Sequence, residues 1–381
     1  MRASHVISFV AVLWGTLMSA CHPAKRGDST STGAMIDSLI PVVSHSFRVE
    51  YYKTYKLIKV YKPGDAKPVN YVLCRKDVSL PDYLKEAVRI ETPVSRLACL
   101  STTHVGALQL LDGRGLIAAA ANTDLICDSE VSAMIKDGKI KNAGHDYQPD
   151  YEVIASVRPQ ILFSDGESGS AGQTLQKLKA LHISVASSRD YFEQDPLARA
   201  EWIKFFAAFV DKEKIADSIF NKVKADYSFI RNNTTETGER PSVFCNVPYN
   251  GIWYMPCGKN YVARLFADAG STFLWQKDEP INGLNLTLNF EQVYERAANA
   301  DFWMNPGVVS SLAQLSDQDA KFKLFKAYRT GQVYNCTNRL SKGGGMDMWE
   351  TGTFRPDLVL RDLSIIFHGS SQDLYYYKRL K

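Results

Sequence analysis

Residues 196–231 read PLARAEWIKFFAAFVDKEKIADSIFNKVKADYSFIR, and no Gly or Pro interrupts the stretch after its first residue. Apolar residues recur in it at helical spacing, as at Ile203, Phe206 and Val210. We therefore predict one long α-helix over 196–231. A helix of about 33 residues spans roughly 50 Å, which is unusual inside one compact domain and natural as a connection between two.

Short apolar runs alternate with helical patterns on both sides of this stretch. Before it, we predict strands at 96–100, 116–120, 159–163 and 183–186, and helices at 105–112, 152–157 and 174–181. After it, we predict strands at 242–246, 301–304 and 333–334, and helices at 261–269, 290–298 and 355–367. The pattern indicates an α/β fold of two Rossmann-like lobes with parallel sheets, joined by one long α-helix. The lobes span 47–195 and 238–381, and ligands of such folds bind at the carboxyl ends of the strands.

The first 21 residues are typical of a secretory signal, with Arg2 followed by an apolar run from Val6 to Met18 that is too short to span a bilayer. Leu17-Met18-Ser19-Ala20-Cys21 resembles a bacterial lipobox, which implies lipidation of Cys21. An ordinary signal peptide with an incidental Cys21 is the alternative. We expect residues 22–46 to be a tether and the protein to be periplasmic, lipid-anchored to a bacterial membrane.

Composition and motifs argue against several function classes. The chain has 45 Lys and Arg and 41 Asp and Glu, a net charge of +4, which gives no support for nucleic-acid binding. The sequence contains no H-E-x-x-H, Walker A, G-x-G-x-x-G or C-x-x-C motif. Residues 166–170, GESGS, approach the G-x-S-x-G motif of hydrolases, but Ser170 replaces its last Gly. We expect no enzyme activity and no cofactor.

Several segments in order carry a family resemblance over residues 96–368. They are 96–104 (RLACLSTTH), 139–144 (KIKNAG), 151–159 (YEVIASVRP), 331–334 (GQVY) and 355–360 (RPDLVL). They resemble the periplasmic binding proteins for ferric siderophores, haem and vitamin B12, although Gln160 replaces the family's usual Asp. The resemblance implies a solute-binding lipoprotein of an ABC importer, whose partners are a permease, an ATPase and a small metal chelate.

In this family one Glu on each lobe meets arginines of the permease. Glu152 and Glu291 occupy the matching positions, each in a predicted first helical turn. A carboxylate there also favours the helix dipole by about 0.3–1 kcal/mol, so a purely structural role is the alternative.

The loops after the strands are expected to line the binding cleft: 101–104, 144–149, 165–172, 248–256 and 339–350. The predicted ligand-contacting residues are Thr102, Thr103, His104, Tyr147, Tyr249, Trp253, Tyr254 and Trp349. Two of the three aromatics at 249–254 are expected in the cleft, and the glycines at 343–345 permit close approach of a ligand. Thr102 and Thr103 alternatively cap a helix. His104 and His145 are either axial ligands of a chelated metal or plain hydrogen-bonding residues.

The nature of the cargo stays open at this level. Aromatic walls suit a planar macrocycle or an aryl chelate, whereas an anionic siderophore needs cations, for which Arg339, Lys342 and Lys259 are candidates. The histidines are scattered, so a site for a free metal ion is not expected. We favour an iron-siderophore or haem, with a cobamide next, and a surface capture lipoprotein without an ABC partner is the second alternative. Residues 47–86 lie outside the resemblance and are expected to form an extra edge hairpin.

Overall fold

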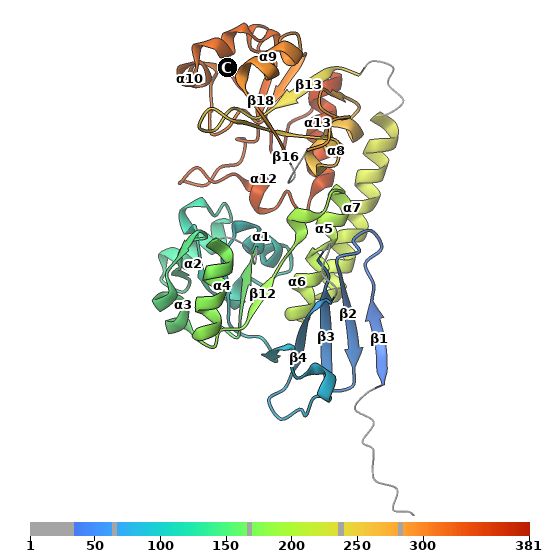
Figure 1. The fold of residues 1–381 in the computed structure, drawn as a ribbon, viewed down its shortest axis with the longest axis vertical. Coiled ribbons are helices and arrows are strands. Elements are labelled where there is room, and N and C mark those ends of the chain that lie inside the picture. The colour runs from blue at the N-terminus through green and yellow to red at the C-terminus, as the bar shows by residue number, and fades with distance from the viewer. Residues whose placement is uncertain (1–33, 63–66, 166–169, 235–239, 281–284) are drawn as a thin grey trace, which may run out of the picture.

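The computed structural model describes residues 34–62, 67–165, 170–234, 240–280 and 285–381. Two lobes lie one above the other, with a long helix running along one side of both and a separate small sheet beside the first lobe (Figure 1). Cys21 and the rest of the predicted signal lie outside the described residues, as do positions 166–169 of the near-hydrolase motif. Within the described part, no helix is long and apolar enough to cross a membrane.

The first lobe is built on a five-stranded parallel sheet in the order β12-β11-β6-β7-β8. Its strands are β6 (Leu97–Cys99), β7 (Ile117–Ala120), β8 (Lys141–Asn142), β11 (Ile161–Ser164) and β12 (Val185–Ser187). The helices α1 (Thr102–Leu110), α2 (Ser129–Lys136), α3 (Tyr151–Val157) and α4 (Ser170–Ala180) connect them. Every residue of β6 and β11 is buried, as in sheets covered on both faces. The predicted parallel sheet is confirmed.

The second lobe repeats this plan, with strands in the order β15-β13-β17-β18-β19 and β19 as an antiparallel edge. The strands are β13 (Ser242–Cys245), β15 (Thr272–Phe273), β17 (Phe302–Met304), β18 (Val333–Asn335) and β19 (Lys378–Arg379). The helices are α8 (Tyr261–Asp268), α9 (Phe290–Ala297), α10 (Leu312–Gln318), α11 (Lys326–Arg329), α12 (Asp347–Glu350) and α13 (Pro356–His368). A separate two-stranded antiparallel sheet is formed by β14 (Trp253–Pro256) and β16 (Asn285–Leu288), which α8 and β15 separate in the chain.

The connection between the lobes is not one helix, and the predicted boundary is wrong. The segment forms α5 (Pro196–Glu201), α6 (Ile203–Phe209) and the 22-residue α7 (Glu213–Thr234). The break falls at Asp211, whose φ of 57° is left-handed, a conformation that Asp tolerates better than most residues. All residues of α6 are buried, whereas α7 buries only one face. Apolar residues recur at the same helical spacing in both, so the sequence pattern does not separate the buried helix from the half-exposed one. Only α7 is the long connecting helix.

Residues 35–91 form a five-stranded sheet of their own, so the predicted tether to residue 46 and the predicted edge hairpin are both corrected. The strands are β1 (Met35–Leu39), β2 (Phe47–Tyr52), β3 (Tyr55–Val60), β4 (Val69–Cys74) and β5 (Val88–Glu91). One face packs on α6 and the residue before it, with the ring centroids of Phe47 and Trp202 4.9 Å apart and those of Tyr71 and Phe209 5.9 Å apart. We call this sheet the accessory sheet.

Glu201, at the end of α5, fastens the accessory sheet to the rest of the molecule. Its side chain is fully buried and its carboxylate accepts hydrogen bonds from the backbone N–H groups of Val42, Val43 and Ser44 at 2.9, 2.8 and 3.0 Å. The ammonium of Lys204 lies 3.3 Å from the same carboxylate. The charge of Glu201 is thus fully compensated inside the protein, which is the condition for burying it.

We expect Glu201→Ala to lower the free energy of unfolding by about 3 kcal/mol or more, because it leaves three N–H groups without their acceptor. It also removes one of the two carboxylates paired with the largely buried ammonium of Lys204, the other being that of Asp217. Urea titration followed by circular dichroism measures the change. The control is Asp226→Ala, which removes an exposed ion pair with Lys222 on α7 and is expected to cost less than about 1 kcal/mol. Equal effects of the two substitutions would contradict this role of Glu201.

Candidate functional site

The strand order places a topological switch point in each lobe. In the first lobe the chain leaves β6 toward β7 on one side and reaches β11 on the other, so the loops after β6 and β11 diverge. Ser101 and Asp165 stand in these loops. In the second lobe β13 and β17 form the switch point and are followed by Asn246 and Asn305. A crevice outside the carboxyl ends of such strand pairs is where open α/β sheets bind ligands.

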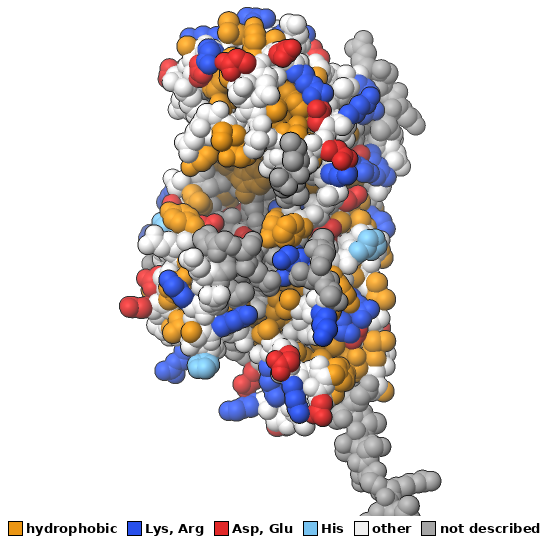
Figure 2. Space-filling model, in the orientation of Figure 1, with side chains coloured by type: hydrophobic (Ala, Val, Ile, Leu, Met, Phe, Trp, Pro, Cys, Tyr) orange, Lys and Arg blue, Asp and Glu red, His pale blue; other side chains and the backbone are white. Residues whose placement is uncertain are grey.

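The two switch points lie at the edges of the sheets that face the other lobe. The chain that leaves β18 at its carboxyl end reaches the first lobe directly, where α12 contacts α1 and the turn after β7. Figure 2 shows a hollow between the two lobes, with hydrophobic side chains gathered along its upper rim. This hollow is the candidate binding cleft.

A chain of polar contacts forms the first-lobe floor of the cleft. Asp165 Oδ1 lies 2.7 Å from His104 Nε2 and 3.4 Å from the oxygen of the Ser188 hydroxyl. The same hydroxyl donates to Asp190 at 3.0 Å, and Arg199 Nε donates to the other oxygen of Asp190 at 3.2 Å. Burial raises the pKa of Asp165, but the attraction and hydrogen bond of His104 outweigh it and hold that pKa below its usual value. Asp165 is therefore ionised at neutral pH.

Arg199 extends this floor to the second lobe. Its guanidinium lies 4.4 Å from the ring centroid of Tyr261 on α8, a cation–π contact between the lobes. Both residues line a narrow pocket between α5, α8, α12 and α13, which Trp349 also borders. Trp349 is 42% exposed, consistent with the predicted cleft wall. Sequence reasoning missed Arg199, since its place in a predicted connecting helix gave no sign of the cleft.

The predicted ligand-contacting residues of the loop after β6, Thr102, Thr103 and His104, make contacts within the protein. Thr102 and Thr103 begin α1, which Ser101 caps by accepting the N–H of Thr103. The Thr103 hydroxyl donates to the backbone oxygen of Trp349 at 2.8 Å and so ties the lobes together. His104 is fully buried, and its predicted position on the cleft lip is wrong. The centroid of its ring lies 6.0 Å from that of Phe163 on β11.

The aromatic candidates divide by the alternation of a β-strand. In β14 the side chain of Trp253 is fully buried and its indole N–H donates to Cys245 O at 2.9 Å, so its predicted place in the cleft is wrong. Tyr254 points the opposite way and is 41% exposed, because successive strand residues face opposite sides. Tyr249 and Tyr147 are exposed too, and the Tyr147 ring stacks on that of His145.

The glycine-rich segment after β18 approaches protein backbone rather than an open space for ligand. A Cβ added at Gly345 would lie 1.9 Å from Leu125 O, and one at Gly343 would lie 2.5 Å from Asp124 O. Asp124 O accepts hydrogen bonds from the Ser341 hydroxyl and the Gly343 N–H at 2.7 and 3.2 Å. We call residues 339–352 the interlobe clasp. The expected close approach of a ligand is corrected for Gly343 and Gly345, whereas nothing lies within 4 Å of a Cβ added at Gly344.

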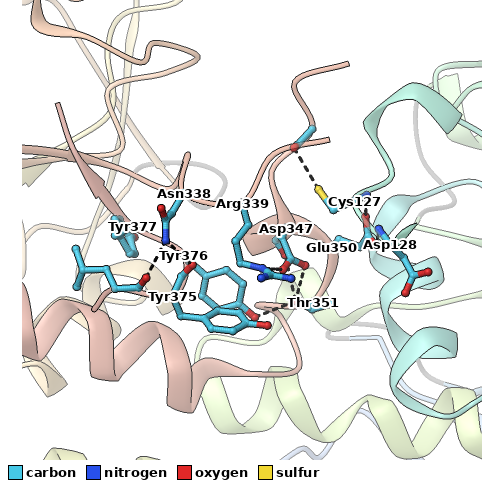
Figure 3. Close-up of polar contacts among 12 residues, drawn as sticks. Cys127, Asp128, Asn338, Arg339, Asp347, Glu350, Thr351, Tyr375, Tyr376 and Tyr377 are labelled. Atoms are coloured by element: carbon cyan, nitrogen blue, oxygen red, sulfur yellow. Dashed lines mark hydrogen bonds and ion pairs between the residues drawn. The ribbon is translucent and has the colours of Figure 1, made fainter. Parts of the chain in front are cut away.

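Glu350 is the buried centre of the clasp (Figure 3). It is 1% exposed, and its two oxygens accept the backbone N–H groups of Cys127 at 2.6 Å and Asp128 at 3.1 Å across the lobe boundary. Burial raises the pKa of Glu350 to about 7 against the opposing pull of these N–H groups, and Asp347 and Asp128 raise it further. Arg339 compensates Asp347, with Nε and Oδ2 2.5 Å apart.

Of the cations considered for an anionic ligand, Arg339 and Lys259 are paired with carboxylates. Arg339 is bound to Asp347 and lies 4.6 Å from the Tyr375 ring centroid. Lys259 pairs with Glu279 at 2.9 Å, and both side chains are largely exposed. Lys342 is exposed on the clasp turn that docks on the first lobe. Among the described residues no group of three or more His, Cys, Asp or Glu could hold a metal ion.

Comparison with known proteins agrees with this architecture. The family model described as periplasmic binding protein matches residues 97–340. The chain belongs to the periplasmic binding protein family. The match begins at β6, so the accessory sheet precedes the part that the family shares. Periplasmic binding proteins of this fold are the type that carries substrates of ABC importers, and the family implies binding of a small-molecule ligand.

Three similar proteins illustrate the family. An uncharacterized lipoprotein of Methanocaldococcus jannaschii is 28% identical over 322 residues, 80% of this chain and 73% of its own. A periplasmic haem-binding protein from Pseudomonas aeruginosa has a TM-score of 0.58 and 15% identity, covering 75% of this chain and 98% of that one. A periplasmic vitamin B12-binding protein of Vibrio cholerae has a TM-score of 0.51 and 12% identity, covering 72% and 97%. The two structural likenesses show the fold of this binding protein, not its ligand.

Sequence reasoning about this binding protein missed Asn246 and Asn305, which lie at the switch point of the second lobe. Both have left-handed φ angles, 66° and 53°, and each directly follows a central strand of the second lobe. Asn tolerates this conformation, so an Asn at the end of a buried apolar run is the signal that marks the turn into the cleft.

The pH dependence of stability is expected to report on Glu350. Because its pKa rises from 4.5 to about 7 on folding, the folded protein is favoured most below pH 4.5 and loses this contribution as pH rises through 7. We expect a loss of about 2–3 kcal/mol between pH 5 and pH 8 relative to Glu350→Gln, which cannot titrate. Denaturant titrations of both proteins across this range measure it, and parallel pH profiles would contradict the assignment.

Proposed function

We propose that this chain captures a metal chelate in the cleft between its lobes and delivers it to the permease of an ABC importer. The observation that carries the proposal is that each lobe has a switch point facing the other lobe; exposed aromatic side chains on the loops expected to line the cleft support it. Tyr249, Tyr254 and Trp349 offer flat apolar faces of the kind that suit a macrocycle or an aryl chelate. An iron-siderophore or haem is the favoured cargo, and a cobamide is the alternative.

Delivery to a permease rests on Glu152 and Glu291. Both side chains are exposed in the first turns of α3 and α9, one on each lobe. The N-termini of these helices are already capped by the side chains of Asp150 and Asn289, so neither glutamate is needed as a cap. An exposed carboxylate on each lobe can pair with cations on a partner and steer association. These features support docking through both lobes.

Anchoring through a lipid at Cys21 completes the proposal. The sequence resembles a lipobox there, and the relative from Methanocaldococcus jannaschii bears the name lipoprotein. A surface capture lipoprotein without an ABC partner would share the fold and the anchor. Docking to a permease is the property that separates the two candidates.

A hydrolase role is disfavoured by the only cluster that resembles a catalytic triad among the described residues. Asp165 and Ser188 both contact Nε2 of His104, whereas a triad places the carboxylate on one ring nitrogen and the nucleophile on the other. His104 is also fully buried. The geometry serves to hold Asp165, not to activate Ser188.

Reversing the charge of both docking glutamates is expected to abolish import while leaving chelate binding intact. The double variant Glu152→Arg/Glu291→Arg would be reconstituted with the cognate permease and ATPase in vesicles, and uptake of an iron chelate or a cobamide measured. The matched control is Glu295→Arg, an exposed residue one turn further along α9. Undiminished uptake by the double variant, or the same loss in the control, would contradict docking through these residues.

A further inference from the structure

The second-lobe side of the cleft carries no formal charge at its switch point. Residues 246–252 (NVPYNGI) and 305–311 (NPGVVSS), which follow β13 and β17, contain no Asp, Glu, Lys, Arg or His. Asn246 donates its amide hydrogen to Tyr254 O at 2.8 Å. Because a backbone carbonyl only accepts, this contact engages one amide hydrogen of Asn246 and turns the amide nitrogen toward Tyr254, so the carbonyl oxygen points the other way and can accept from a ligand.

Asn305 follows β17 at the same switch point, and its side chain hydrogen-bonds with the buried Tyr377. Its amide oxygen is buried and has no hydrogen-bond partner within the described residues. An acceptor left in this state costs about 1–3 kcal/mol, which a donor supplied from the cleft would offset. Both asparagines therefore favour a ligand that donates hydrogen bonds.

The exposed charge on the first-lobe side is negative. The side chain of Asp165 is 49% exposed, whereas that of Arg199 is 14% exposed and paired with the buried Asp190. Arg189, which precedes Asp190, is 4% exposed. The charge that a ligand meets at this switch point is thus the ionised carboxylate of Asp165, held in place by His104.

We propose that the cleft selects a neutral or cationic chelate that carries N–H or O–H donors, and discriminates against anionic chelates. Asp165, Asn246 and Asn305 would accept hydrogen bonds from one face of such a ligand, and the exposed aromatic side chains would cover its apolar part. An anionic ligand would instead face an ionised carboxylate and two carbonyl oxygens with no exposed, uncommitted cation among these groups. This inference rests on the proposed function and narrows its substrate class.

Four probes separate charge from chelate type: a cationic ferric tris-hydroxamate, a neutral cobamide with amide side chains, an anionic ferric tris-catecholate, and haem with its carboxylates. Isothermal titration of the chain from residue 22 onward gives each affinity. We expect the tris-hydroxamate or the cobamide to bind at least about tenfold more tightly than either anionic probe. Asp165→Asn should weaken binding of the cationic probe by about tenfold or more, because a hydrogen bond to a charged group is lost.

Asp137→Asn is the matched control, since Asp137 is an exposed aspartate at the carboxyl end of α2 and outside the loops expected to line the cleft, and it should change affinity by less than about threefold. If Asp165→Asn fails to fold, the affinity of the wild-type protein for the cationic probe is measured at increasing salt concentration instead. The inference predicts that added salt weakens this binding, and an affinity that does not change with salt would contradict it.

The outcomes distinguish this inference from the function beneath it. Equal or tighter binding of the tris-catecholate or haem overturns the charge selectivity and leaves chelate capture standing. Binding of none of the four overturns the proposed chelate function, and the inference with it. Binding of the cationic or neutral probe by the wild-type protein, together with weaker binding of the cationic probe by Asp165→Asn, supports both the charge selectivity and the chelate-binding function.

Discussion

The arrangement of the lobes depends on the backbone contact between the interlobe clasp and the turn after β7. Gly343 and Gly345 approach Asp124 and Leu125 more closely than any residue with a Cβ would permit, and Glu350 accepts two N–H groups across the boundary. Buried hydrogen bonds of this kind have strict geometry, so they fix the distance between the two sheets as well as joining them. Together with α7, which spans both lobes on one side (Figure 1), the clasp gives the molecule two separate interlobe connections.

Fixing the sheets fixes the cleft, because both switch points lie at sheet edges rather than on long loops. Asp165 follows β11 directly, and Asn246 and Asn305 follow β13 and β17 directly. Side chains placed this way need little ordering when a ligand arrives, so less conformational entropy opposes binding. Under the proposed function, this preformed polar cluster and the exposed aromatic residues on the neighbouring loops would suit a ligand with a polar face and an apolar remainder.

Much of the fold was predictable from local pattern, and the errors have physical causes. Fully buried strands such as β6 and β11 read as apolar runs, and their alternation with helices indicated parallel sheets. The predicted connecting helix was too long because apolar residues keep the same helical spacing through α6 and α7, on both sides of the left-handed Asp211. In the candidate site, His104 and Trp253 were misplaced because spacing does not tell which way a first-turn or strand side chain points. The glycines of the clasp signalled a close approach correctly, but the sequence could not say that its partner is the other lobe.

The most direct test of the account is a crystal structure of the protein with a bound iron or cobalt chelate, with the metal located by its anomalous scattering. The account predicts a metal between the two sheets, with the chelate in contact with Asp165 on one side and with Asn246 or Asn305 on the other, and with the clasp unchanged. A metal bound outside the cleft, or a chelate held by one lobe alone with the clasp broken, would contradict it.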